Sequence, residues 1–214
     1  MARVSYRPFE DSDFEALVPV VRELWYPEDD PDVASDECAV LEASIDLAHC
    51  LAISTFSQVA LIDSVPSGIV LARAEGTTEP TFAAWAEAEQ KFSRELQERL
   101  PEACESFQIW RDRVEAVDHG LVAGCDVPAG NEIVLLVAAR SARGLGIGSV
   151  LFDAASLYFV EQDQKQAYLF TDTDCTWEFY EHRGMRRLAT YRAHRDERHL
   201  LPHEMYVYGM DLSA

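Results

Sequence analysis

The order of apolar and polar residues along the chain predicts a mixed α/β protein. Apolar runs of strand length stand at 59–62, 69–72, 132–138 and 167–171, and further strand-like segments occur at 3–8, 186–192 and 204–212. Apolar residues recur at helical spacing over 14–25, 35–50 and 149–161. The run at 132–138 is almost uninterrupted, which is typical of a central strand covered on both faces. We therefore expect an α/β fold whose sheet mixes parallel and antiparallel strands.

Turn and cap signals mark the edges of several elements. Ser12 and Glu15 stand three positions apart before the first helical run, a spacing typical of a capping box. The polar segment 63–68, which contains Pro66 and Gly68, predicts a hairpin between the strands on either side of it.

The segment 77–130 differs from its surroundings, and we interpret it as a helical insertion within a single domain spanning 1–214. Pro101 is expected to separate two helices, because proline is tolerated in a first turn but not in a helix interior. The two apolar stripes are Trp85, Phe92, Leu96 and Leu100, then Phe107, Trp110, Val114 and Val117. Such stripes usually face a core, so packing is the favoured role, and lining a substrate pocket is the alternative.

Composition and charge narrow the class of partner. Hydrophobic residues make up 48% of the 214, and 38 acidic residues against 18 basic ones give a formal net charge of −20. This excess disfavours nucleic acid and anionic membrane surfaces as partners, because both require a basic face. A cationic small substrate would be attracted to it, although a solvated acidic exterior explains most of these carboxylates equally well.

Cysteine and histidine usage predicts neither disulfides nor a metal site. The five cysteines are odd in number and none has CxxC spacing, which fits reduced thiols. The histidines near the C-terminal end lack metal-ligand spacing, so no metal is expected. The first residues have no apolar signal core, and no apolar stretch is long enough to span a bilayer. Together these features predict a cytoplasmic protein.

Residues 143–148, with the sequence Arg-Gly-Leu-Gly-Ile-Gly, are the most informative segment of the chain. They lie between a predicted strand and a predicted helix. Alternate glycines leave backbone N–H groups uncrowded, and the helix start adds free N–H groups and the positive end of its dipole. This arrangement predicts an anion cradle, most often for a phosphate or pyrophosphate. The dinucleotide pattern GxGxxG is not met, because Ser149 stands where its last glycine would fall.

Together with the preceding apolar strand, this turn resembles the acyl-CoA signature of the GNAT superfamily of N-acetyltransferases. A second segment, Phe179 to Met185, resembles that family's Phe-Tyr-x-x-x-Gly-Phe sequence, with Met185 in place of the usual aromatic. The likeness covers 132 to about 192. One departure is the connection 138–142, which is one residue longer than usual and lacks the usual proline. The resemblance implies a GNAT-like acyl-CoA N-acyltransferase fold that carries a helical insertion.

The resemblance also implies acetyl-CoA as cosubstrate. The backbone of Leu136, Val137 and Ala138 would hold the pantetheine arm and the thioester carbonyl. The pyrophosphate would be held by the backbone amides of Gly144, Leu145, Gly146, Ile147, Gly148 and Ser149, and Arg143 would add a cationic contact. The competing interpretation is a tight strand-to-helix turn that binds no ligand.

Acetyl transfer to an amine requires a neutral nucleophile, a polarised carbonyl and a proton for the leaving thiolate. By its family position Tyr180 would supply that proton; alternatively it is a core tyrosine. Glu132 would be the general base; alternatively it lies at an exposed strand end. Asp172 and Asp174 share one face of an extended chain and could bind a cationic amine, or cap the next helix. Cys175 is interpreted as an inert thiol.

These features predict an N-acetyltransferase that moves an acetyl group from acetyl-CoA to a primary amine of a small molecule or peptide. The expected mechanism is direct attack in a ternary complex, and because family members often pair, a homodimer is compatible with it. One alternative is a GNAT-fold module that binds acyl-CoA without turnover. Another is an interaction protein whose aromatic insertion is the working part.

Overall fold

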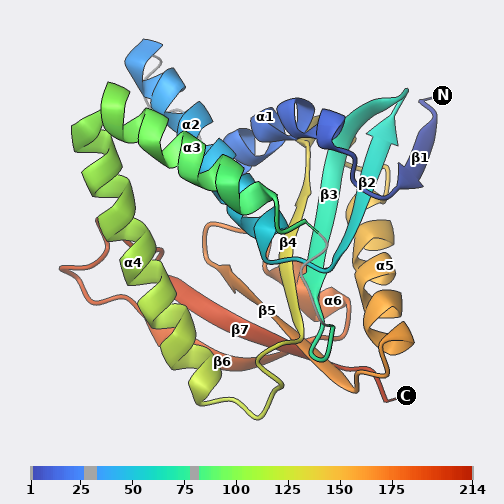
Figure 1. Ribbon diagram of the computed structural model, residues 1–214. Helices are drawn as coiled ribbons and strands as arrows, with labels where there is room; N and C mark the ends of the chain where they lie inside the picture. The colour runs from blue at the N-terminus through green and yellow to red at the C-terminus, as the bar shows by residue number, and fades with distance from the viewer. Residues whose placement is uncertain (1, 27–32, 78–81, 214) are drawn as a thin grey trace. The chain divides into compact units, whose positions relative to one another are not determined.

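The computed structural model describes residues 2–26, 33–77 and 82–213 (Figure 1). Within them the strands form a seven-stranded mixed sheet in the order β1-β2-β3-β4-β5-β7-β6, so the predicted α/β fold is confirmed. The chain divides into two compact units. The first comprises 1–73, 77–104 and 133–158, and the second comprises 74–76, 105–132 and 159–214.

The first unit begins with an antiparallel meander. β1 (Val4–Arg7) pairs with β2 (Phe56–Ile62), which pairs with β3 (Val65–Arg73). The turn between β2 and β3 consists of Asp63 and Ser64 alone, with φ angles of 49° and 72°. A two-residue turn of this kind matches the twist of the strands it joins. The predicted hairpin is confirmed, but its turn is shorter than 63–68, because the residues from Val65 onward already pair as β3.

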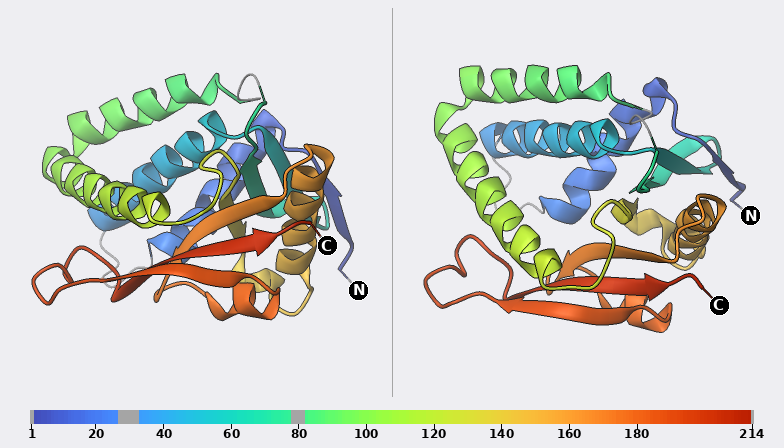
Figure 2. Two further views of the ribbon diagram at one scale, coloured as in Figure 1. Left: turned by 90° about the horizontal axis from the view of Figure 1, so that it is seen from below. Right: turned by 60° about the horizontal axis from the view of Figure 1, so that its bottom comes forward.

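Three helices belong wholly to this unit, and one of them, from the segment 77–130, packs against the other two. They are α1 (Phe14–Trp25), α2 (Val33–Ala52) and α3 (Trp85–Arg99), and α3 runs beside α2 (Figure 2). The ring of Phe14 stacks on Trp85 and Phe92, with centroids 4.4 Å and 5.6 Å apart. Leu96 is fully buried. The helix α3 therefore directs its aromatic stripe into the core, as the packing interpretation predicted.

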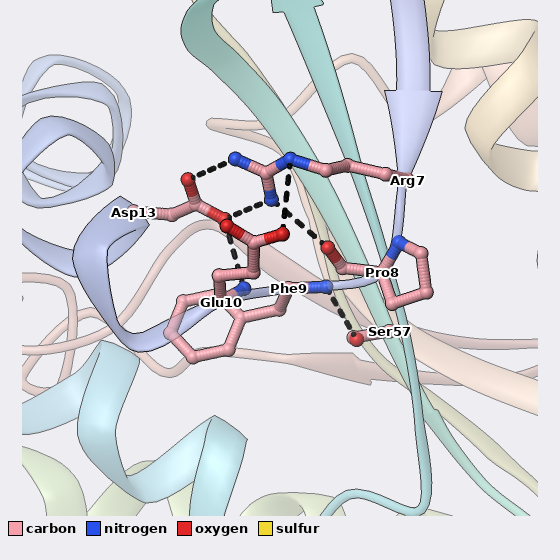
Figure 3. Close-up of polar contacts among 6 residues, drawn as sticks. All are labelled: Arg7, Pro8, Phe9, Glu10, Asp13 and Ser57. Carbon is pink, nitrogen blue, oxygen red and sulfur yellow. Dashed lines mark hydrogen bonds and ion pairs between the residues drawn. The ribbon is translucent and has the colours of Figure 1, made fainter.

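A buried ion pair fixes the approach to α1 (Figure 3). Arg7 donates two hydrogen bonds to the Asp13 carboxylate, of 2.6 Å and 2.7 Å, and Asp13 is 2% exposed. The backbone N–H of Glu10 donates to the same carboxylate at 2.9 Å, and Glu10 and Asp13 form the capping box. The predicted box at Ser12 and Glu15 is wrong by two positions, because the carboxylate that accepts the backbone N–H is that of Asp13 rather than a group at Ser12.

The second unit is built on an antiparallel ladder. In it β5 (Gln166–Asp172) pairs with β7 (Glu204–Asp211), and β7 pairs with β6 (Arg186–Arg192). Most of α4 (Pro101–Ala123) belongs to this unit and packs Val117 against Ala193, Leu201 and Met205, where β6 leads into β7 (Figure 2). The helix α4 thus also faces a core, and it begins at Pro101, which separates it from α3 as predicted.

Candidate active site

The glycine turn of the first unit depends on backbone conformations that favour glycine. It follows β4 (Glu132–Ala138) and leads into α5 (Ile147–Glu161). Gly144 and Gly146 have φ angles of 81° and 72°, and no atom lies within 4 Å of a Cβ added at either position. The requirement for glycine is therefore conformational rather than a matter of space. Arg143 beside them is exposed.

Backbone N–H groups in this turn fall into two sets. Those of Leu145 and Ser149 are already used, donating to the carbonyls of Ala142 and Gly146 at 3.2 Å and 3.1 Å. The second set has no backbone carbonyl as acceptor among the described residues. It consists of the N–H groups of Gly144, Gly146, Ile147 and Gly148. Four unpaired N–H groups at the positive end of a helix dipole are what a bound anion requires.

The strand before the turn is held close to β3. A Cβ added at Gly68 would lie 2.9 Å from the carbonyl oxygen of Val137 and 3.2 Å from Cα of Ala138. Val137 is buried, whereas Leu136 and Ala138 are half-buried. Glycine at 68 therefore permits the close approach that fixes the position of this part of β4, which is the part predicted to hold the pantetheine arm.

Glu132 is buried in the second unit. It is 8% exposed, it pairs in parallel with Tyr168 of β5, and its Oε2 lies 3.3 Å from the Tyr168 hydroxyl. That hydroxyl also donates to the carbonyl of Ala129 at 2.9 Å. The alternative of an exposed strand end is therefore wrong. A carboxylate in this setting is able to accept a proton, and its role as the general base stays a prediction.

Tyr180 lies on the short helix α6 (Glu178–His182) of the same unit. Burial raises the pKa of Tyr180, and the neighbouring Cys175 and Asp172 raise it further. The phenol consequently holds its proton at neutral pH, as a proton donor must. Loss of hydration, followed by the charge of Asp172, also raises the pKa of the Cys175 thiol to about 12. The residue is nevertheless exposed, so its interpretation as an inert thiol stays a prediction.

Asp172 shapes the turn between β5 and α6. Its Oδ1 accepts the backbone N–H groups of Asp174 and Cys175 at 2.7 Å and 3.2 Å. Burial raises the pKa of Asp172 despite these bonds, and the charge of Asp174 adds to that rise. Asp174 itself is exposed. A role for either aspartate in binding an amine stays a prediction.

The structure adds Asp118, which the sequence analysis missed. Burial raises the pKa of Asp118 on α4 to about 7, and the charges of Glu132 and Asp172 contribute. The second unit thus brings Glu132, Asp172 and Tyr180 into one electrostatic neighbourhood with a residue of the insertion. A single acidic residue beside an apolar stripe gave no sequence signal, because such residues usually lie on a solvated helix face.

Two further observations concern the described part of the chain only. It contains no group of three or more His, Cys, Asp or Glu residues that could hold a metal ion. It also contains no helix with both the length and the apolar character needed to cross a bilayer.

Comparison with known proteins connects this architecture to one fold. No protein-family model and no curated protein matches the chain. Among solved structures, a GNAT-family acetyltransferase from Desulfovibrio desulfuricans is similar with a TM-score of 0.55 and 13% identity, over 99% of this chain and 100% of that one. The ribosomal-protein-S18-alanine N-acetyltransferase from Escherichia coli is similar with a TM-score of 0.55 and 7% identity, over 99% and 96%. Naa50 from Arabidopsis thaliana, solved with the bisubstrate analogue CoA-Ac-MVNAL, is similar with a TM-score of 0.53 and 16% identity, over 97% and 98%. The chain therefore has the fold of the GNAT acetyltransferases.

Proposed function

We propose that this protein is an N-acetyltransferase that moves the acetyl group of acetyl-CoA to a primary amine of a small molecule or peptide. The observation that carries the proposal is the glycine turn of a chain with GNAT fold. Four N–H groups in this turn and at the start of α5 have no backbone acceptor in the part of the chain that the structure describes. The pyrophosphate of coenzyme A is the anion that the turn would bind, through the amides of Gly144, Gly146, Ile147 and Gly148.

Acetyl-CoA supplies an acetyl group activated as a thioester, and the protein supplies the proton transfers. Glu132 accepts a proton from the ammonium form of the acceptor, directly or through water, which leaves a neutral amine. The amine nitrogen forms a bond to the carbonyl carbon while the carbon–sulfur bond breaks. Tyr180 gives its proton to the departing thiolate, and the extra proton on the acylated nitrogen passes to the Tyr180 phenolate, directly or through water. Glu132 then releases its proton to solvent, which returns both groups to their starting states.

Three observations support a cationic or peptide acceptor. The net charge of −20 attracts amines in their ammonium form, and Asp172 and Asp174 stand beside the turn that leads to Tyr180. In addition, the similar structure from Arabidopsis contains an analogue that joins coenzyme A to a peptide. We propose Asp172 and Asp174 as contacts for the amine, with the protein acting without a metal ion.

Release of the free thiol from acetyl-CoA tests the proposal when it is measured against a panel of polyamines, aminoglycosides, amino acids and peptides. Tyr180→Phe should lower kcat by about 10²- to 10⁴-fold, the range typical of a lost general acid, and should leave the affinity for acetyl-CoA unchanged. Tyr158→Phe is the matched control, because it removes a buried phenol hydroxyl of the first unit that bonds Thr55.

The outcomes separate the candidate functions. Binding of acetyl-CoA by calorimetry without thiol release for any acceptor would favour a non-catalytic acyl-CoA-binding module. Absence of binding to acetyl-CoA and to coenzyme A would refute the proposal itself. Turnover that survives Tyr180→Phe would leave an enzyme with a different proton donor.

A further inference from the structure

One partly exposed cationic side chain of the second unit, that of Arg187, contacts three aromatic rings. The guanidinium carbon of Arg187 lies 3.9 Å from the ring centroid of Tyr206, 4.7 Å from that of Trp177 and 5.4 Å from that of Tyr208. Cations over aromatic faces are attracted by the ring quadrupole, more strongly where water is excluded. Arg187 thus joins α6 and the segment before it to the β6–β7 ladder.

Directed hydrogen bonds give this arrangement a fixed geometry. Arg187 donates through Nε to the Tyr208 hydroxyl at 2.8 Å and through a terminal nitrogen to Oε1 of Glu181 at 3.1 Å. The Tyr208 hydroxyl donates to the same Oε1 at 2.7 Å. The three side chains therefore form a closed triangle, which a point charge without the planar fork of arginine cannot reproduce.

Tyr180 stands next to two corners of this triangle. It precedes Glu181 in α6, and its ring centroid lies 6.1 Å from that of Tyr208. The helix has only five residues, too few to be stable by itself, so its orientation depends on tertiary contacts. Arg187 therefore contacts the residue that follows Tyr180 in the chain, Glu181, and the tyrosine whose ring lies near that of Tyr180, Tyr208.

The chain between Tyr180 and Arg187 is short and tightly closed. The N–H of Met185 donates to the carbonyl of Tyr180, and the N–H of Gly184 donates to that of Glu181, both at 3.0 Å. With Gly184 at a φ of 84°, these bonds form a Schellman motif that ends α6. Beyond it, Arg187 pairs across the ladder with Tyr208, and a bulge follows before Ala189. Residues directly opposite each other in an antiparallel pair share a face of the sheet, so Arg187 lies on the face that carries Tyr208.

We infer that Arg187 is a positioning residue, which holds the Tyr180 phenol in its reactive orientation through Glu181 and Tyr208. The inference rests on the proposed function, in which Tyr180 protonates the thiolate. Misplacement of a catalytic group by 1 Å can cost about 10²-fold in rate. Loss of the triangle should therefore lower kcat while leaving the KM for acetyl-CoA unchanged.

Two variants remove the triangle in different ways, and a third serves as the control. Arg187→Met keeps an unbranched side chain but removes the guanidinium, and Tyr208→Phe keeps the ring but removes the hydroxyl. Each should lower kcat by about 10- to 100-fold, and Arg187→Lys should restore only part of the loss. Arg192→Met, at the far end of the same strand, removes an exposed arginine paired with Glu204 and should change neither parameter.

A double-mutant cycle separates positioning from general destabilisation. If Arg187 acts through Tyr180, then Arg187→Met should cause no further loss of kcat in a Tyr180→Phe background. Equal losses in both backgrounds, or an unchanged kcat in the single variants, would overturn the inference. Thermal melts of each variant show whether lost activity reflects an unfolded fraction, and Tyr208→Phe carries the test if Arg187→Met does not fold.

A second measurement does not depend on turnover. In protein labelled with ¹³C-tyrosine, the ring signal of Tyr180 can be identified by its loss in Tyr180→Phe. It should shift or broaden in Arg187→Met and stay unchanged in Arg192→Met. An unchanged signal in both would refute the positioning role whatever the activity. Absence of turnover in the wild type, with the signal shifted as expected, would instead refute the proposed function and retain the structural coupling.

Discussion

Replacing Gly146 by alanine is the most direct test of the cradle. The residue is exposed at a φ of 72°, and no atom lies within 4 Å of an added Cβ. An alanine therefore meets no neighbour and alters only the preference of the backbone. Because the turn is exposed, the free protein can relax into another conformation, and the conformational cost then appears when coenzyme A binds.

The magnitude follows from the left-handed conformation. For a residue with a Cβ this region costs roughly 1–2 kcal/mol relative to right-handed backbone. Since each 1.4 kcal/mol is a factor of ten in a dissociation constant, Gly146→Ala should weaken coenzyme A binding by roughly 5- to 30-fold. Asparagine tolerates this region better than alanine, so Gly146→Asn should weaken binding less.

Calorimetry with coenzyme A measures the effect, and Gly76→Ala is the matched control. Gly76 is also exposed, has a φ of 85° and has no atom within 4 Å of an added Cβ, but it lies outside the turn. The control should bind coenzyme A with the affinity of the wild type. Equal affinity of the wild type, Gly146→Ala and Gly76→Ala would refute the idea that the turn must hold its glycine conformation to bind the pyrophosphate.

Three further predictions concern stability and reactivity. Asp13→Asn breaks the buried pair with Arg7 and should lower the free energy of unfolding at pH 7 by about 1–3 kcal/mol, as for other hydrogen bonds to charged groups. Burial opposes ionisation of Asp13, but the Arg7 bonds lower its pKa overall. The difference in unfolding free energy between wild type and variant, measured by urea denaturation, should therefore shrink as the pH falls below about 3.9. A difference independent of pH would contradict the assignment. Asp118→Asn should stabilise the protein above pH 7, because burial and neighbouring carboxylates raise the pKa of Asp118 to about 7. That gain in stability should disappear below about pH 4, where the aspartate is protonated in both the folded and unfolded states. Thermal melts between pH 4 and pH 8 measure it, and a gain that increased as the pH fell would contradict the reasoning. Cys175 is exposed, but loss of hydration and the charge of Asp172 raise its thiol pKa to about 12. Because little of it is thiolate, it should react with iodoacetamide at pH 8 at least about tenfold more slowly than an ordinary thiol. A rate equal to that of free cysteine would show that its pKa is not raised.

Local sequence patterns were sufficient for the elements and for the glycine turn. The apolar run 132–138 predicted β4 with its observed bounds, and Pro101 marked the start of α4, because alternation, helical spacing and proline act within a few residues. The turn at 143–148 was likewise predicted, since its alternate glycines determine which backbone conformations are available.

Contacts between distant segments decided the rest. The ion pair of Asp13, just before α1, needs Arg7 of β1, and the contact of the buried Glu132 is with Tyr168 of β5. Asp118 joins the acidic neighbourhood only because α4 packs beside the end of β6. Sequence spacing sets which side chains share a face, whereas partners, burial and pKa values arise from strand pairing and helix packing across tens of residues. The sequence alone therefore determined the fold class and the candidate anion cradle, and the tertiary structure determined the environment of the acid–base groups.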